Sequence, residues 1–130
     1  MRAMIIDDSR AARSLMRRML QRLGYEVTEA GDGLEALEAF KAGVSVDIAL
    51  VDWNMPNMDG LELVKRVRKE LRDADTTMMM VTSESDPKRV ARALMAGADE
   101  YLVKPIDVAM LRDKFELLGL AYDDSQLEVA

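Results

Sequence analysis

Short apolar runs alternate with longer amphipathic segments along the whole chain. The apolar runs predict β-strands at residues 3–6, 25–30, 48–51, 77–81 and 99–103. Two stretches within them, 48–51 and 78–81, are apolar at every position. Continuous apolar runs are typical of strands in a parallel sheet that helices cover on both faces.

Amphipathic helices are predicted between these strands and after the last one. Apolar side chains recur there at helical spacing, as on the first of these faces, which has Ala12, Leu15, Met16, Met19, Leu20 and Leu23. The later helices have apolar faces that include Leu34, Leu37, Leu61, Val64, Val90, Leu94, Leu111 and Phe115. Suitable capping residues stand at the expected helix starts and ends: Ser9, Asp86 and Asp107 at starts, Gly24 and Gly97 at ends.

Five strands that alternate with five helices predict an α/β fold on a parallel sheet. We expect a flavodoxin-like, doubly wound architecture of five βα units, with strand order 2-1-3-4-5 and helices on both faces. Residues 1–119 form the predicted domain. Residues 120–130 are expected to form an acidic C-terminal tail that frays, with no output domain.

The composition excludes several kinds of chemistry. The 130 residues include no cysteine and no histidine, so disulfides, thiolate or imidazole metal sites, serine–histidine triads and an internal phosphohistidine relay are excluded. The net charge of −6 disfavours binding to nucleic acid. No apolar stretch approaches the roughly 18 residues of a membrane span, and no signal peptide opens the chain. We therefore expect a cytoplasmic protein with no membrane partner.

Polar residues stand where the predicted strands end. Asp7 and Asp8 follow the first strand, Asp52 the third, Thr82 the fourth and Lys104 the fifth. The carboxyl ends of parallel strands lie on one edge of the sheet, and ligands bind there where the winding direction reverses. The sequence therefore predicts one cluster of three carboxylates, a hydroxyl and an ammonium group.

Such a cluster suits metal-assisted phosphoryl transfer. Three neighbouring carboxylates repel one another unless a cation joins them, and Mg²⁺ prefers a few carboxylates, waters and a phosphate oxygen. A carboxylate can itself accept a phosphoryl group as an aspartyl phosphate. Lys104 would supply a positive charge and Thr82 a hydroxyl donor to the transferring group.

Each residue alone also has an ordinary structural explanation. A single Asp8 would favour the positive end of the following helix, and a single Lys104 would be a solvated surface charge. Their joint occurrence at the strand ends favours the functional interpretation. An EF-hand loop starting at Asp52 is excluded, because Asn57 and Leu63 stand where Gly and Glu are required.

The chain from about Met4 to Leu118 resembles a response-regulator receiver domain. The segment Asp52–Gly60, Asp-Trp-Asn-Met-Pro-Asn-Met-Asp-Gly, is most similar to single-domain chemotaxis regulators of the CheY type. The resemblance implies that Asp52 is the phosphoacceptor. It also implies a Mg²⁺ site and a cis peptide bond between Lys104 and Pro105. The implied metal ligands are Asp7, Asp8, Asp52 and the backbone carbonyl of Asn54.

The resemblance further implies a conformational switch. Thr82 and Lys104 would contact the phosphoryl group. When the phosphoryl group draws the Thr82 hydroxyl inward, the aromatic side chain of Tyr101 would move into the space that Thr82 leaves. The surface of the fourth helix, fifth strand and fifth helix would then change shape. Asn54 and Glu84 occupy positions that tune dephosphorylation in the family. Plausible contact residues for a partner are Lys88, Arg92, Tyr101 and Lys114.

The expected function is that of a stand-alone response regulator in a chemotaxis-like two-component system. A histidine kinase would be the phosphoryl donor, and the chain would catalyse only its own phosphotransfer and dephosphorylation. The flagellar motor switch is the first expected target. The alternatives are a phosphorelay shuttle that works with a histidine phosphotransferase and a phosphate-independent adaptor. We expect a monomer, and the sequence leaves dimerisation through the fourth helix to the fifth helix open.

Overall fold

The computed structural model describes residues 1–127 and contains one five-stranded parallel sheet. The strands are β1 (Arg2–Ile6), β2 (Glu26–Ala30), β3 (Ile48–Val51), β4 (Thr77–Thr82) and β5 (Glu100–Val103). The helices are α1 (Arg10–Arg22), α2 (Gly33–Lys41), α3 (Gly60–Lys69), α4 (Pro87–Ala96) and α5 (Val108–Leu117). The sheet order is β2-β1-β3-β4-β5, which confirms the predicted doubly wound α/β fold.

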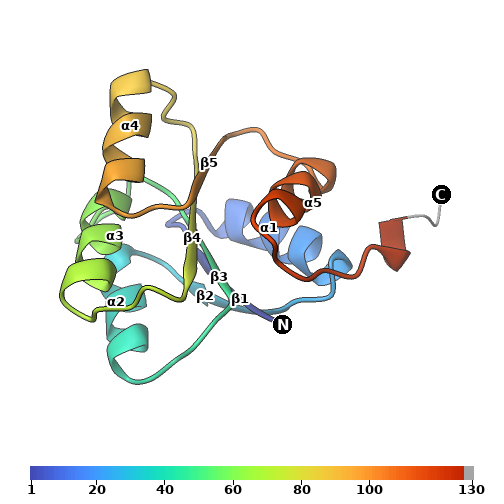
Figure 1. The fold of residues 1–130 in the computed structure, drawn as a ribbon, viewed down its shortest axis with the longest axis horizontal. Coiled ribbons are helices and arrows are strands. Elements are labelled where there is room, and N and C mark those ends of the chain that lie inside the picture. The colour runs from blue at the N-terminus through green and yellow to red at the C-terminus, as the bar shows by residue number, and fades with distance from the viewer. Residues whose placement is uncertain (128–130) are drawn as a thin grey trace.

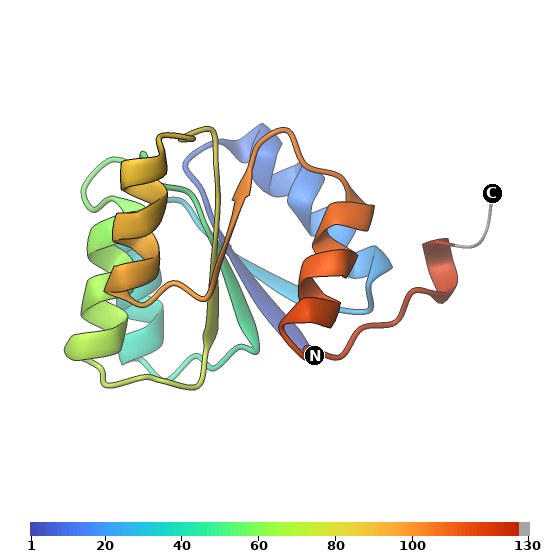
Figure 2. The same ribbon diagram turned by 45° about the horizontal axis from the view of Figure 1, so that its top comes forward.

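The helices form two layers on opposite faces of the sheet. Helices α1 and α5 cover one face, and α2, α3 and α4 cover the other (Figures 1 and 2). Successive strand residues point to alternate faces, so Ile5 and Leu50 belong to the core under α1 and α5, whereas Ile6 and Val51 belong to the core under α2 to α4. This double coverage is the reason why β1, β3 and β4 have continuous apolar runs.

All five helices begin at a side-chain cap. The capping side chains accept a hydrogen bond from a backbone N–H group in the first turn, and they belong to Ser9, Asp32, Asp59, Asp86 and Asp107. Each such cap stabilises its helix by about 1 kcal/mol. Since each helix follows a strand, these capped N-termini lie at the carboxyl edge of the sheet. The β-to-α loops at that edge are therefore anchored at their helix ends.

Three leucines of the predicted apolar faces are not buried. Leu15 is 50% exposed, and Leu34 and Leu94 are each 43% exposed. Each stands on the flank of its helix stripe, whereas neighbours such as Met16 and Leu37 point into the core. The helical period identifies the apolar side of a helix more reliably than it identifies the edge of the buried stripe.

The segment after α5, which the sequence predicted to be an acidic tail, makes contacts with the domain as far as Leu127. Leu120, Tyr122 and Leu127 pack against the core under α1 and α5. The Tyr25 hydroxyl donates to the carbonyl of Ala121 at 2.6 Å, and the N–H group of Asp123 donates to the carbonyl of Leu23 at 2.9 Å. Residues 128–130 of the predicted acidic tail lie outside the described residues. Within residues 1–127, none of the helices is long and apolar enough to cross a membrane.

Candidate functional site

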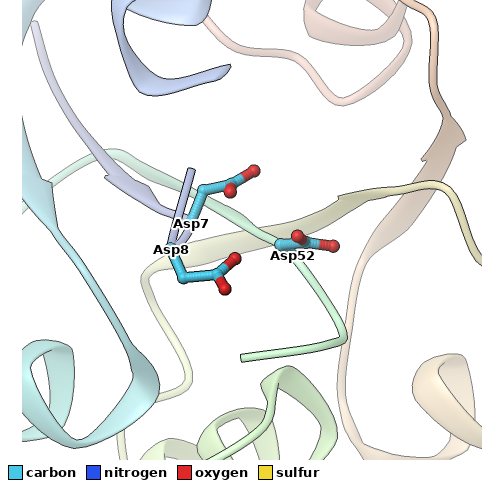
Figure 3. Close-up of side chains that lie close together, drawn as sticks. All are labelled: Asp7, Asp8 and Asp52. Carbon is cyan, nitrogen blue, oxygen red and sulfur yellow. The ribbon is translucent and has the colours of Figure 1, made fainter. Parts of the chain in front are cut away.

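The strand register brings the predicted site residues to one edge of the sheet. Ile6 of β1 pairs with Val51 of β3, Val51 pairs with Met80 of β4, and Thr82 pairs with Val103 of β5. The residues that follow these positions therefore lie side by side at the carboxyl edge. Figure 3 shows the side chains of Asp7, Asp8 and Asp52 gathered there.

The three carboxylates form a compact acidic cluster. One oxygen from each of Asp7, Asp8 and Asp52 lies within 4.8 Å of the other two. Asp7 is fully buried, Asp52 is half-buried and Asp8 is exposed. The Lys104 ammonium lies 2.7 Å from an Asp7 oxygen and 3.7 Å from an Asp52 oxygen. One lysine against three acids leaves the cluster negatively charged, and its oxygen donors suit a hard divalent cation such as Mg²⁺.

The backbone around Asp52 is closely packed. Its N–H group donates to the carbonyl of Ile6, and one carboxylate oxygen accepts from the N–H group of Trp53 at 2.8 Å. Gly60 donates to the carbonyl of Trp53 at 2.8 Å. A Cβ atom added to Gly60 would lie 2.2 Å from the carbonyl oxygen of Asp52, so this position admits only glycine without a shift of the backbone.

The loop between β3 and α3 is also joined to the loop between β2 and α2. The Asn57 side chain, whose backbone has a φ of 66°, donates to Asp32 at 2.7 Å. Gly33 donates to the carbonyl of Met58 at 3.2 Å. The hydrogen bonds from the Glu35 N–H group and from Asn57 hold the pKa of Asp32 below its usual range. These contacts fix the loop that follows Asp52, and nothing in the sequence pattern predicts them.

Thr82, Glu84 and Tyr101 form a second connected group beside the acids. Thr82 is fully buried, and its hydroxyl accepts from the N–H group of Glu84 at 3.3 Å. Tyr101 is 8% exposed, and its hydroxyl donates to the carbonyl of Glu84 at 2.6 Å. Burial, together with the negative charges of Glu84 and Asp52, raises the pKa of Tyr101. The Tyr101 side chain is therefore buried beside the loop that carries Glu84. The peptide bond between Lys104 and Pro105 is cis.

Arg89 contacts Trp53 and Glu84, and the sequence did not predict these contacts. Its guanidinium lies over the Trp53 ring at 5.7 Å from the centroid and 3.5 Å from a carboxylate oxygen of Glu84. Arg89 therefore links α4 to the residue next to Asp52 and to the loop that accepts the Tyr101 hydroxyl. A lone arginine in the first turn of a helix gives little indication of this role in a sequence.

The four proposed partner-contact residues do not form one uniform surface. Lys88 and Arg92 are exposed on α4. Tyr101 is buried, and Lys114 on α5 pairs with Glu100 at 3.2 Å. Of the two residues expected to tune dephosphorylation, Asn54 is exposed in the β3–α3 loop, and Glu84 is half-buried. Lys88, Arg92 and Asn54 are therefore the most exposed members of these two sets, whereas Lys114 and Glu84 are partly exposed.

Comparison with known proteins agrees with the fold and identifies the family. The family model described as "Response regulator receiver domain" matches residues 3–116. The chain is 40% identical to the chemotaxis protein CheY1 of Helicobacter pylori over 119 residues, which is 91% of this chain and 96% of that protein. It is 41% identical to the chemotaxis protein CheY homolog of Campylobacter jejuni over 130 residues, covering 98% of this chain and 100% of that protein.

Solved structures show the same similarity. The chemotaxis response regulator CheY4 of Vibrio cholerae superposes with a TM-score of 0.80 at 35% identity, over 90% of this chain and 97% of that one. A CheY-like receiver domain protein from Methanospirillum hungatei gives a TM-score of 0.82 at 29% identity, over 99% of this chain and 98% of that one. The chain therefore belongs to the family of response regulator receiver domains.

Proposed function

We propose that this chain is a response-regulator receiver domain of the CheY type that accepts a phosphoryl group on Asp52. Receiver domains of the CheY type are regulatory switches in two-component signalling, and they take phosphate from a histidine kinase and act on downstream targets. The observation that supports the assignment of Asp52 most strongly is its position within 4.8 Å of the Asp7 and Asp8 oxygens and 3.7 Å from Lys104.

The acidic cluster fits a Mg²⁺ ion. Asp8 and Asp52 would bind the ion directly with the backbone carbonyl of Asn54, and Asp7 would bind it through water. The cluster is rich in hard oxygen donors and has only one lysine to balance three negative charges. A bound Mg²⁺ ion would neutralise charge on the phosphoryl oxygens during transfer.

Asp52 would act as the nucleophile. A P–O bond forms between one carboxylate oxygen of Asp52 and the phosphorus of a phosphohistidine, while the P–N bond of the donor breaks and its electron pair stays on the histidine nitrogen. Lys104 would balance negative charge on the transferred group, and the Thr82 hydroxyl would donate to one of its oxygens. The donor histidine must come from another protein, because this chain has none.

The switch would work through Thr82, Glu84 and Tyr101. A phosphoryl group that draws the Thr82 hydroxyl toward itself would lengthen the hydrogen bond that this hydroxyl accepts from the N–H group of Glu84, whose carbonyl accepts from the Tyr101 hydroxyl. One local charge can therefore bias the position of the aromatic ring and the shape of the α4-β5-α5 surface. The similarity to chemotaxis proteins favours the motor switch as the target over a histidine phosphotransferase. A cytoplasmic location of the protein stays a prediction.

Phosphorylation by a small-molecule donor tests this function. Incubation with acetyl phosphate and Mg²⁺ should add one phosphoryl group to the wild-type protein. Asp52→Asn should prevent the addition, whereas Asp107→Asn, which changes only the cap of α5, should leave it unchanged. Full labelling of the Asp52→Asn variant would show that another residue is the acceptor. A wild-type protein that is never labelled would favour the adaptor.

A further inference from the structure

Asp7 is held by hydrogen bonds at all of its polar groups. Its N–H group donates to the carbonyl of Ala30 at 3.1 Å. Its two carboxylate oxygens accept from the N–H group of Ser9 at 2.8 Å and from Lys104 at 2.7 Å. Its carbonyl oxygen accepts from the Arg13 guanidinium at 2.6 Å. The first three contacts fix the residue, whereas the fourth fixes the peptide unit that leads into Asp8.

Arg13 is itself held in place by a carboxylate from the neighbouring strand. Its Nε–H group donates to Glu29 of β2 at 2.9 Å, and its side chain is only 18% exposed. The second oxygen of Glu29 accepts from Arg17 at 2.8 Å. Burial alone would raise the pKa of Glu29, but the hydrogen bonds from Arg17 and Arg13 lower it below its usual range. The carboxylate therefore stays charged and keeps both guanidinium groups oriented.

We propose that Arg13 is a positioning residue for the metal site, acting through the carbonyl of Asp7. This inference rests on the proposed function of the acidic cluster. Asp8 is exposed, so the direction of its carboxylate depends on the backbone before it. The bond from Arg13 fixes that backbone, and Glu29 fixes Arg13. Removal of a group that orients a metal ligand in this way commonly lowers the metal affinity of a protein by about 10- to 100-fold.

Arg13 could affect Mg²⁺ binding through its charge or through its positioning of the Asp7 carbonyl. Its removal should change the Mg²⁺ affinity in opposite directions in the two cases, so experiment can separate them. A cation near the acids repels Mg²⁺, and its loss would strengthen metal binding if charge were the main effect. Its loss weakens metal binding if positioning is the main effect. Glu29 lies 2.9 Å from Arg13 and 2.7 Å from Arg17, so it offsets part of the positive charge of each guanidinium and reduces the charge effect of Arg13 on the metal site.

Arg17 provides a matched control. It lies on the same helix and binds the same Glu29 carboxylate, but it is Arg13, not Arg17, that donates to the Asp7 carbonyl. Arg13→Met and Arg17→Met each remove one positive charge and one partner of Glu29. Only Arg13→Met removes the hydrogen bond to the backbone carbonyl of Asp7.

The test is the Mg²⁺ dissociation constant of the full chain, measured from Trp53 fluorescence and independently from the Mg²⁺ dependence of the melting temperature. Arg13→Met should raise this constant by about tenfold, and Arg17→Met by less than about twofold. Arg13→Lys should not restore binding, because lysine keeps the charge but lacks the fork that reaches both Glu29 and the carbonyl. Glu29→Gln should have an intermediate effect, and it provides a second test if Arg13→Met does not fold.

The outcomes are distinct. Equal Mg²⁺ affinity of the Arg13→Met and Arg17→Met variants, or tighter binding by Arg13→Met, would overturn the positioning role while leaving the proposed function intact. Wild-type Mg²⁺ affinity in the Arg13→Lys variant would show that the paired guanidinium contacts with Glu29 and the Asp7 carbonyl are not required, and it would also overturn the positioning role. A wild-type protein that binds no Mg²⁺ up to tens of millimolar would overturn both the inference and the metal-dependent function.

Discussion

Replacing Asp8 by asparagine should stabilise the metal-free protein. The exposed Asp8 carboxylate has an oxygen within 4.8 Å of oxygens of Asp7 and Asp52. Within residues 1–127, the ammonium group that pairs with this cluster is that of Lys104, and it lies against Asp7 and Asp52. Asp8→Asn keeps the shape of the side chain and removes one negative charge. Because a favourable effect of Asp8 on helix α1 is lost at the same time, the sign depends on which term is larger.

The magnitudes favour stabilisation. At 4.8 Å two like charges repel by about 0.9 kcal/mol in water and by about 3.5 kcal/mol at an effective dielectric constant of ~20. Since Asp8 is exposed, the value in water is the better guide, and its two acidic neighbours together give about 2 kcal/mol. Loss of the interaction with the positive end of α1 costs about 0.3–1 kcal/mol. The net gain should be about 1 kcal/mol.

Unfolding with and without Mg²⁺ measures this gain. In EDTA the Asp8→Asn variant should have a free energy of unfolding about 1 kcal/mol above that of the wild type, or a melting temperature about 3–5 °C higher. Mg²⁺ should then stabilise the wild type much more than the variant, because a metal ligand is missing. An Asp8→Asn variant that is less stable than the wild type in EDTA, or that gains as much from Mg²⁺, would refute the reasoning.

Three further changes test other parts of the structure. Gly60→Ala should destabilise the fold by about 1–3 kcal/mol in urea unfolding and slow phosphorylation, because its Cβ would lie 2.2 Å from the Asp52 carbonyl oxygen. Burial and a nearby acid raise the pKa of Tyr25 to about 12 from 10.0. The neutral phenol is therefore favoured in the folded state, and stability should fall as the pH rises from about 10 to about 12, with a shallower fall in Tyr25→Phe. Arg89→Gln should cost about 0.5–1 kcal/mol, because the cation–π contact with Trp53 is lost, as thermal unfolding would show.

Each of these predictions has a control. Gly31→Ala should be much milder than the Gly60 substitution, since its Cβ would meet the flexible ends of two side chains, Glu35 at 3.3 Å and Arg13 at 3.8 Å, and no backbone atom. Identical profiles for wild type and Tyr25→Phe between pH 10 and 12 would contradict the role of the Tyr25 phenol. For Arg89, the variant Arg92→Gln serves as the comparison, because Arg92 is exposed on the same helix and makes no recorded contact with Trp53. Equal effects of the two arginine changes would argue against the contact.

The sequence predicted the sheet and the central acids for a topological reason. Parallel strands end at one edge, so residues that follow the strands must meet there whatever the loops do. Asp7, Asp52 and Lys104 could be grouped in this way without any knowledge of loop conformation. The strand bounds also agree with the predictions to within one residue at each end, because apolar runs covered on both faces have clear limits.

The supporting contacts could not be predicted because they depend on loops and on long side chains. The bond from Asn57 to Asp32 needs a backbone φ of 66° in one loop and the correct approach of another. The reach of Arg13 to a carbonyl and of Arg89 to Trp53 depends on rotamers that the helical period does not specify.

The C-terminal segment shows a different limitation. Its negative charges suggested a fraying tail, but three apolar side chains within it determine its position. Leu120, Tyr122 and Leu127 lie against the core under α1 and α5, and the Tyr25 hydroxyl donates to the backbone carbonyl of Ala121. Net charge describes how such a segment interacts with solvent on average, whereas a few apolar contacts decide whether it packs.

The central claim is that Asp52 carries the phosphoryl group, and the position of the modified residue tests it most directly. Borohydride reduces an aspartyl phosphate to homoserine, so peptide mass spectrometry after phosphorylation and reduction locates the acceptor. We expect homoserine at position 52 in the wild-type protein, and only when Mg²⁺ and a phosphoryl donor are both present. Homoserine at position 7 or 8, or a phosphoryl group that resists reduction, would contradict the account.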